Sequence, residues 1–537
     1  MLNKPTDDMN DTTKKTHTKE KQYIIPSGVN ILEYLRSKDI FIPAPCGGAG
    51  TCGKCKIRLI AGCLPDNGND RALLSDDEIN SGLRLACRSN TNMPVRIQLF
   101  TEPDKENFSI CTDHGNEQDH EIDLKDMDSG HEYGIAIDLG TTTIAAEITD
   151  ITENVGLITR ASVNRQRTFG ADVVSRIEAA ASGRGEELKR IIEKDLCDLV
   201  ESMGISSETR ISKVVISGNT TMYHLLMEYD VSGIASFPFS PVSLGGEWFL
   251  RDEVFSLETV KRKVLPQDCR IYLMPGLGAF VGGDIFSGMY ATGITRDKGV
   301  SFFIDIGTNA EMVLKKEDMY FTTSAAAGPA LEGGNLKWGT GSVAGAISGV
   351  TANTSGFGIK TISDAAPVGI CGTGAIEAVY ELLQAGILDR YGTFAERYRD
   401  HGFPLAKSVM GEIISLDQDD IRQIQMAKAA IRAGAEALMK HAGVSADEVD
   451  RVYVSGGFGS YLDMKKAAGT GLLPEGLLCK AQATGNTSLK GAQMALSDGI
   501  RSSADEEYQR IMSKTEPVDL ANDEWFKERY IECMNFE

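Results

Sequence analysis

Two segments of this chain repeat one pattern, and the repeat limits the folds that the chain can adopt. GIAIDLGTTT, which contains Asp138, and FFIDIGTNAE, which contains Asp305, each place an apolar run typical of a buried strand before Asp-x-Gly-Thr. Both lie in a region that alternates apolar strands, glycine-rich turns and helical stretches such as 420–441. A supersecondary unit that recurs in this way predicts a duplicated α/β domain with two similar lobes.

The residues of the repeat suit a nucleotide phosphate. The chain has no G-x-x-x-x-G-K-[ST] motif, so a P-loop ATPase is not supported. A Gly-Thr-Thr turn presents backbone N–H groups and hydroxyls to phosphate oxygens, and the preceding Asp can hold Mg2+ through water. Two such turns facing each other would clamp a triphosphate, and a third glycine-rich string, VSGGFG, follows another predicted strand. The predicted nucleotide-contacting residues are Gly140, Thr141, Thr142, Thr143, Gly307, Thr308, Asn309, Gly456, Gly457, Phe458 and Gly459.

A single Asp-x-Gly-Thr would say little, because Asp-Gly turns often follow strands for steric reasons. The ordered set of three resembles the superfamily of acetate and sugar kinases, heat-shock chaperone ATPases and actin, where these strings are the phosphate-1, phosphate-2 and adenosine motifs. The resemblance implies a two-lobed ribonuclease-H-like ATPase domain. It places MPGLGAFVGGDIFSG, with Asp284, at the first helix connecting the lobes and ATGNTSLKGAQMAL at the second. Asp138, Asp305 and Asp284 are the predicted catalytic residues, the first two as holders of hydrated Mg2+.

Four cysteines closer to the N-terminus indicate a second site. Cys46, Cys52, Cys55 and Cys87 are spaced C-x5-C-x2-C-x31-C, three on one loop and one returning later. This is how a 2Fe-2S cluster is wrapped; the first gap is one residue longer than the plant-type spacing, as in adrenodoxin-like ferredoxins. Glycines between the cysteines would supply the positive φ angles that such a loop needs. The alternatives are a zinc site with four cysteine ligands, or cysteines that serve as small buried hydrophobes.

An acidic segment divides the chain. Residues 1–20 are polar and predicted to be a disordered tail, and residues 21–100 are predicted to form a β-grasp 2Fe-2S ferredoxin domain. Residues 101–131 carry ten acidic residues and two lysines, so we expect a flexible acidic linker that lets the ferredoxin domain visit more than one docking site. Residues 132–537 form the two-lobed ATPase domain. The predicted fold class is therefore α/β multidomain.

Charge and hydropathy exclude some classes of partner. The chain has 55 Lys and Arg against 76 Asp and Glu, a net charge of -21 that would repel nucleic acids and acidic membranes. It begins without an apolar signal region and has no apolar run near the roughly 18 residues of a membrane helix. Eleven cysteines are too few for a disulfide scaffold. We expect a soluble cytoplasmic protein.

The strings SGNTTMYHLL, AAAGPALEGG, PVGICGTGAIEAV, IQMAKAAIRAG, VSGGFGSYLD and GLLPEGLL resemble the family of reductive activators of corrinoid proteins. The likeness runs from about Tyr23 to Glu537 apart from the linker. It implies that ATP hydrolysis drives one low-potential electron from the 2Fe-2S cluster to a corrinoid protein, reducing Co(II) to Co(I) for methyl transfer. It also implies a homodimer formed through the ATPase domain and a separate low-potential electron donor protein.

The chain departs from this family in a few places. Family members usually carry a further small domain between ferredoxin and ATPase, whereas this chain has only the linker. Ala310, Leu331 and Thr373 replace the Gly, Phe and Ser of the family pattern.

Two other functions fit the same motifs. A small-molecule kinase with an appended iron-sulfur redox sensor would share the ATPase fold and could recruit Asp284 as its catalytic base. A chaperone-like module, in which ATP gates partner release, would need the cluster only for structure. The resemblance covers both domains and favours electron transfer over either alternative.

Overall fold

The computed structural model describes residues 21–65, 70–99, 130–204, 211–256, 265–353, 356–408, 411–456, 462–497 and 503–537. They belong to two compact units, Met1–Glu106 and Asn107–Glu537. The predicted tail and almost all of the predicted linker lie outside the described residues.

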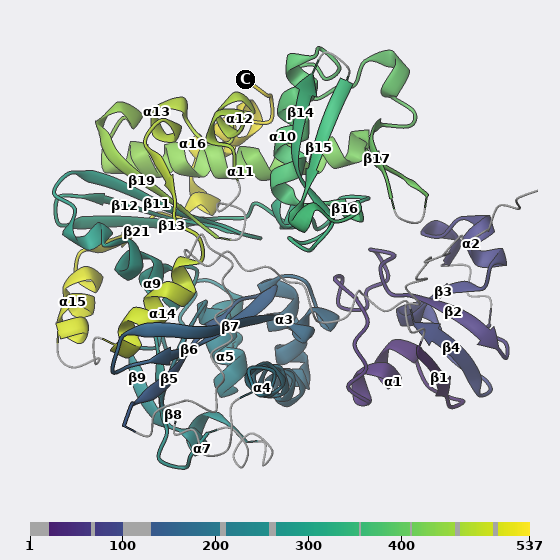
Figure 1. The fold of residues 1–537 in the computed structure, drawn as a ribbon, viewed down its shortest axis with the longest axis horizontal. Helices are drawn as coiled ribbons and strands as arrows, with labels where there is room; N and C mark the ends of the chain where they lie inside the picture. The colour runs from purple at the N-terminus through teal and green to yellow at the C-terminus, as the bar shows by residue number, and fades with distance from the viewer. Residues whose placement is uncertain are drawn as a thin grey trace, which may run out of the picture. The chain divides into compact units, whose positions relative to one another are not determined.

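A four-stranded sheet forms the N-terminal unit, with the strand order β1-β4-β2-β3 and every neighbouring pair antiparallel (Figure 1). Helix α1 (Ile31–Ser37) begins where the Asn30 side chain accepts a hydrogen bond from the Glu33 N–H at 3.2 Å and so caps its first turn. Its apolar residues are buried in the core below the sheet. The other elements are β1 (Lys21–Ile25), β2 (Lys56–Ala61), η1 (Asp70–Ala72), α2 (Asp76–Asn80), β3 (Leu83–Leu85), η2 (Ala86–Arg88) and β4 (Val95–Leu99).

The larger unit contains two six-stranded sheets. The first has the order β7-β6-β5-β8-β10-β9 and the second β20-β19-β11-β12-β13-β21 (Figure 1). The strands of the first are β5 (Tyr133–Leu139), β6 (Thr143–Asp150), β7 (Val155–Val163), β8 (Ile211–Gly218), β9 (Glu247–Leu250) and β10 (Arg270–Leu273). Those of the second are β11 (Val300–Ile306), β12 (Ala310–Lys316), β13 (Met319–Ala325), β19 (Val449–Ser455), β20 (Ala481–Ala483) and β21 (Thr515–Pro517).

Both sheets have the same plan around their first strand. β5 runs antiparallel to β6 and parallel to β8, and β11 runs antiparallel to β12 and parallel to β19. The two Asp-x-Gly-Thr segments therefore occupy the same place in the two lobes, between the first strand and the second. Because the carboxyl ends of parallel strands form one edge of a sheet, residues that follow β5 and β8 meet at that edge, and so do those that follow β11 and β19.

Helices cover the sheets. Those of the first lobe are α3 (Val173–Ala179), α4 (Gly185–Glu201), α5 (Thr220–Met227), α6 (Ser232–Ala235) and α7 (Arg251–Val254). The second lobe has α10 (Gly372–Gln384), α11 (Gln418–Ala442), α12 (Met464–Gly469), α13 (Glu475–Leu478), α15 (Ser503–Met512) and α16 (Glu524–Glu532). The helix predicted at 420–441 is confirmed as α11. Between β13 and α11 the chain adds two small sheets, formed by β14 (Ala346–Asn353), β15 (Gly356–Thr361) and β16 (Gly369–Ile370), and by β17 (Phe403–Lys407) and β18 (Ile413–Leu416).

Two helices pack against each other between the lobes. They are α9 (Gly283–Thr292) and α14 (Thr487–Ser497), and their side chains share one buried cluster with residues of both sheets. A Cβ at Gly491 would lie 2.2 Å from the Ser287 carbonyl oxygen, and one at Gly288 would lie 2.4 Å from the Phe303 ring. Only glycine therefore allows this close approach of the helices.

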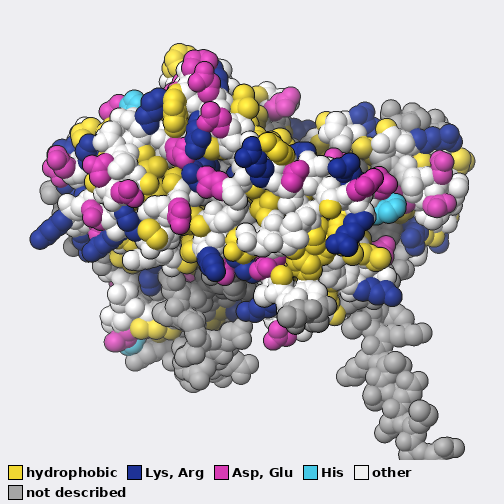
Figure 2. All heavy atoms as spheres, turned by 90° about the horizontal axis from the view of Figure 1, so that it is seen from above, with side chains coloured by type: hydrophobic (Ala, Val, Ile, Leu, Met, Phe, Trp, Pro, Cys, Tyr) yellow, Lys and Arg dark blue, Asp and Glu magenta, His cyan; other side chains and the backbone are white. Residues whose placement is uncertain are grey.

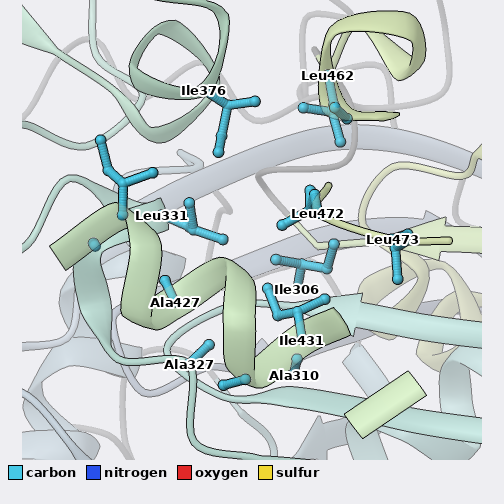
Figure 3. Close-up of a cluster of buried hydrophobic side chains, with 14 of the residues drawn as sticks. Ile306, Ala310, Ala327, Leu331, Ile376, Ala427, Ile431, Leu462, Leu472 and Leu473 are labelled. Carbon is cyan, nitrogen blue, oxygen red and sulfur yellow. The ribbon is translucent and has the colours of Figure 1, made fainter. Parts of the chain in front are cut away.

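A large apolar core fills the second lobe. Figure 3 shows Leu331, Ile306 of β11, Ile376 of α10 and Ile431 of α11 within one cluster of buried side chains. On the surface, the face shown in Figure 2 intersperses acidic with basic side chains. No helix among the described residues is both long and apolar enough to cross a bilayer.

Candidate nucleotide and cluster sites

Asp138 and Asp305 occupy equivalent positions near the ends of the first strands of the two lobes. Asp138 of β5 pairs in register with Ser217 of β8, and Asp305 of β11 pairs with Ser455 of β19. Both strand pairs are parallel, so each Asp and its Ser lie at the edge of the sheet where the glycine-rich turns follow. The predicted equivalence of the two carboxylates is therefore seen in the strand register.

The start of α14 and the residues before it fix both carboxylates. Ser488 Oγ donates to Asp138 Oδ1 at 2.7 Å, and Asn486 Nδ2 donates to Asp138 Oδ2 at 2.9 Å. Ser455 Oγ lies 3.0 Å from Asp305 Oδ2 and 2.5 Å from Thr487 Oγ1. Residues 486 and 488 thus bind Asp138 directly, and Thr487 is linked to Asp305 through Ser455.

Asp284 lies at the start of α9 and completes a group of three carboxylates. Burial, followed by the charges of Asp305 and Asp138, raises the pKa of Asp284 to about 7. Burial is also the main cause that raises the pKa of Asp305 to about 6, and burial raises the pKa of Asp138. A divalent cation would favour the ionised forms of these groups and offset their mutual repulsion. Carboxylate oxygens are ligands that Mg2+ prefers, but no three acidic, His or Cys side chains among the described residues are grouped closely enough to hold a metal ion directly, so Mg2+ here would keep its water ligands.

Side chains behind the first glycine turn hold its backbone in place. Asn164 Nδ2 donates to the Gly140 carbonyl at 2.9 Å, and Arg176 Nη2 donates to the Thr141 carbonyl at 2.6 Å. Asn219 Nδ2 donates to Thr141 Oγ1 at 2.9 Å. Because the carbonyls of Gly140 and Thr141 accept these hydrogen bonds, the backbone of the turn is fixed in one conformation. Thr143 begins β6, directly after the turn.

Glu332 joins the two glycine turns and was missed from the sequence. Its Oε2 accepts from Thr142 Oγ1 of the first turn at 3.2 Å and from Thr308 Oγ1 of the second. The second turn is closed by the Gly307 N–H, which donates to the Asn309 carbonyl at 2.8 Å. The string AAAGPALEGG contains Glu332, but no local pattern in it points to a contact with a turn 190 residues away.

The third predicted string is described only in part. Gly456 has φ 92°, and a Cβ there would lie 2.6 Å from the Ile306 carbonyl oxygen, so glycine is required. Gly457, Phe458 and Gly459 lie outside the described residues. A sequence signal for this edge was available, because VVISGN around Ser217 and VYVSGG around Ser455 repeat each other as the two Asp segments do.

The four cysteines of the N-terminal unit form two pairs. Cys46 and Cys52 Sγ atoms lie 3.3 Å apart, and so do those of Cys55 and Cys87. Two thiolates on one tetrahedral metal lie about 3.8 Å apart for a metal–sulfur distance of about 2.3 Å. Both observed distances are shorter than this ligand spacing, so it is the number and pairing of the thiols that match a cluster with two iron ions, each held by two cysteines.

The loop that carries the first three cysteines is shaped for anionic sulfur. Gly47, Gly48, Gly50 and Gly53 all have positive φ, as the sequence predicts for such a loop. Burial acts to raise the pKa of Cys46, but hydrogen bonds from the backbone at Thr51, Cys52 and Gly48 and from the Cys52 side chain lower it to about 6. Backbone N–H groups therefore favour the thiolate of Cys46, whereas burial raises the pKa of Cys52 on the same loop.

Two arginines hold this loop from the protein side. Arg36 of α1, whose side chain is 3% exposed, donates to the Gly47 carbonyl at 3.0 Å and to Glu33 Oε1 at 2.7 Å. Arg88 donates to the Ala49 carbonyl from η2. Both residues lie outside the cysteine motif and were not predicted.

The three departures from the family pattern are accommodated. Ala310 and Leu331 are buried in the core of the second lobe, as Figure 3 shows. Thr373 lies in the first turn of α10, where its hydroxyl is 3.1 Å from Cys371 Sγ.

Three family models match the chain. They are described as a 2Fe-2S iron-sulfur cluster binding domain at residues 15–91, a RACo middle region at residues 133–297, and the C-terminal domain of RACo, the ASKHA domain, at residues 299–537. The middle region coincides with the first lobe. Because this model lies within the predicted ATPase domain, it does not test the expectation that a further small domain between ferredoxin and ATPase is missing.

Characterised relatives match across most of the chain. The corrinoid activation enzyme RamQ of Eubacterium limosum is 32% identical over 74% of this chain and 69% of its own length. A [Co(II) methylated amine-specific corrinoid protein] reductase of Methanosarcina barkeri is 26% identical over 66% of this chain and 68% of its own length. A solved structure, the reductive activator for corrinoid, iron-sulfur protein, aligns over 95% of this chain and 96% of its own, with 27% identity and a TM-score of 0.68.

Proposed function

Because the chain belongs to the family of reductive activators of corrinoid proteins, we propose that it uses ATP hydrolysis to move one electron from a 2Fe-2S cluster to the Co(II) form of a corrinoid protein. It is a corrinoid-activating reductase with a ferredoxin domain and an ATPase domain in one polypeptide. The product of the electron transfer is Co(I), the form used in methyl transfer. ATP is hydrolysed to ADP and phosphate, and a low-potential donor protein returns the electron to the cluster.

One observation carries this proposal: a four-cysteine loop built for a cluster and a two-lobed phosphate cleft occur in the same chain. The chemistry of a kinase or of a chaperone-like ATPase does not itself require an electron carrier, which in those proteins would serve only as a sensor or a structural element. An electron transfer to cobalt at very low potential, however, needs a source of free energy, because each 59 mV uphill costs about tenfold in the equilibrium constant. ATP can supply it if the conformations that it favours bind the oxidised and reduced partners with different affinity.

The cleft residues receive the following roles. Asp138 and Asp305 hold hydrated Mg2+ between the lobes, and the two glycine turns bind the phosphates through their N–H groups and hydroxyls. Asp284, with its pKa near 7, accepts a proton from the water that attacks the terminal phosphate. Gly456, Gly457, Phe458 and Gly459 contact the adenosine.

Cys46, Cys52, Cys55 and Cys87 would hold the cluster, and the thiol pairs Cys46–Cys52 and Cys55–Cys87 would each serve one iron. When bound, it accepts and releases one electron at a time. We further propose that the chain is a homodimer through its ATPase domain.

The test is to mix the purified protein with a candidate corrinoid protein and an electron donor and to follow Co(I) by absorbance. We expect Co(I) with ATP, and much less with ADP or a non-hydrolysable analogue. Equal yields with all three nucleotides would show that ATP does not drive the electron. A redox-sensing kinase would form no Co(I) in any of these mixtures, and a gating chaperone would release its partner whether or not the cluster is present.

A further inference from the structure

Glu332 has a fixed position at the end of η7 (Pro329–Glu332). The residue before it, Leu331, is 2% exposed and belongs to the apolar core of the second lobe (Figure 3). The residue after it, Gly333, has φ 78°, and a Cβ there would lie 2.0 Å from the Thr340 carbonyl oxygen. The backbone on both sides of Glu332 is therefore confined, and its side chain is aimed by the fold.

The side chain of Glu332 contacts both glycine turns. One oxygen, Oε2, accepts hydrogen bonds from Thr142 in the first lobe and Thr308 in the second. The other, Oε1, lies next to the backbone of the second turn, 3.4 Å from where a Cβ of Gly307 would be. One carboxylate thus bridges the lobes at the two turns that are assigned to phosphate.

A phosphate and this carboxylate need the same donors. A threonine hydroxyl has a single hydrogen to donate, so Thr142 and Thr308 cannot serve Glu332 and a phosphate oxygen together. The two acceptors are also both anionic, and like charges in contact repel. A phosphate that reaches both hydroxyls must therefore displace Glu332.

Glu332 adds to a negative cleft. After burial and Asp138, its charge is a further cause that raises the pKa of Asp305. Arg176 is buried and donates to the Thr141 carbonyl, which places a cation behind the first turn. The Glu332 carboxylate therefore repels a phosphate that approaches the two glycine turns.

We propose that Glu332 competes with the terminal phosphate of ATP for the hydroxyls of Thr142 and Thr308, and so makes the cleft discriminate between ATP and ADP. This rests on the proposed nucleotide site. Binding of ATP exchanges a bridge made by a protein carboxylate for a bridge made by the γ-phosphate. ADP lacks that phosphate and leaves the carboxylate bridge in place.

The experiment measures the dissociation constants of MgATP and MgADP by calorimetry for the full chain and for Glu332→Gln, with Glu332→Ala as a second variant. Glutamine keeps the shape of glutamate but removes its charge. We expect MgATP to bind about tenfold more tightly to either variant, and MgADP to change by less than about threefold, because only ATP displaces the side chain.

Two further variants act as controls. Glu317→Gln makes the same charge change at an exposed residue between β12 and β13, and it should leave both dissociation constants unchanged. Thr308→Val removes one of the contested donors; it should weaken MgATP binding and shrink the gain from Glu332→Gln when the two are combined.

The outcomes separate this inference from the proposed function. If the unaltered chain binds neither nucleotide, the nucleotide site itself is wrong. If it binds both, but Glu332→Gln binds MgATP no more tightly or tightens both nucleotides equally, the competition is refuted while the ATPase assignment stands. Weaker MgATP binding in both Glu332 variants would instead make Glu332 a support of the phosphate site and would also refute it.

Discussion

At the scale of single residues, Asp284 links pH to both stability and activity. A buried carboxyl with a pKa near 7 keeps its proton in the folded state at pH values where the unfolded chain has lost it. The free energy of unfolding therefore falls as the pH rises from about 4 to about 7. Above about pH 7 it stays at this lower value. Asparagine cannot ionise and avoids this cost.

We therefore predict that Asp284→Asn raises the melting temperature, and that the gain grows from pH 5 to about pH 7 and is then constant. Thermal melts without Mg2+ or nucleotide would measure it. The same variant should lose most ATP hydrolysis if Asp284 accepts the proton from water. A gain that shrinks as pH rises would contradict the raised pKa.

Arg36 is the residue outside the cysteines on which the cluster loop most depends. Its buried guanidinium holds the Gly47 carbonyl next to Cys46. We predict that Arg36→Gln loses iron to a chelator about tenfold faster, as is typical when a partner of a metal-binding loop is removed. Absorbance of the cluster would follow the loss. Arg96→Gln, at an exposed position of β4, is the control and should keep the native rate.

At the scale of elements, α9 and α14 approach each other closely at Gly491, where an added Cβ would lie 2.2 Å from the Ser287 carbonyl oxygen. A larger side chain there must push the helices apart, which typically costs about 1–3 kcal/mol. We predict that Gly491→Val lowers the melting temperature and the rate of ATP hydrolysis together. Gly185→Ala is the control: no atom lies within 4 Å of the added Cβ and the backbone is helical, so the melting temperature should stay or rise slightly.

Strand-and-turn patterns predicted the two Asp segments, the cluster loop and the helix α11 because each depends on neighbours in the chain. Glu332, Asn486 and Ser488 could not be found in this way. Asn486 and Ser488 bind Asp138 across 348 and 350 residues, a contact that only the packing of α14 on the first lobe creates. Arg36 was not predicted for a related reason: in the sequence, an arginine that is buried on an amphipathic helix cannot be told from one that is exposed to solvent.

At the scale of the whole molecule, the chain has two compact units with separate cores. We predict two calorimetric transitions in the full-length protein. Cys52→Ala, which removes one cluster ligand, should lower only the transition of the N-terminal unit and should largely preserve ATP hydrolysis. MgATP should raise only the other transition. A single transition shifted by both changes would show that the units unfold together.

The placement of residues 486–488 also limits how this protein could have evolved. Asn486 and Ser488 serve the acidic group of the first lobe, while Thr487 contacts Ser455 in the second, so alternate residues of one segment belong to different halves of a duplicated structure. A gene split between the lobes would leave the first half without the donors for Asp138. Neither lobe could therefore be exchanged for the lobe of another protein unless residues 486–488 were exchanged with it.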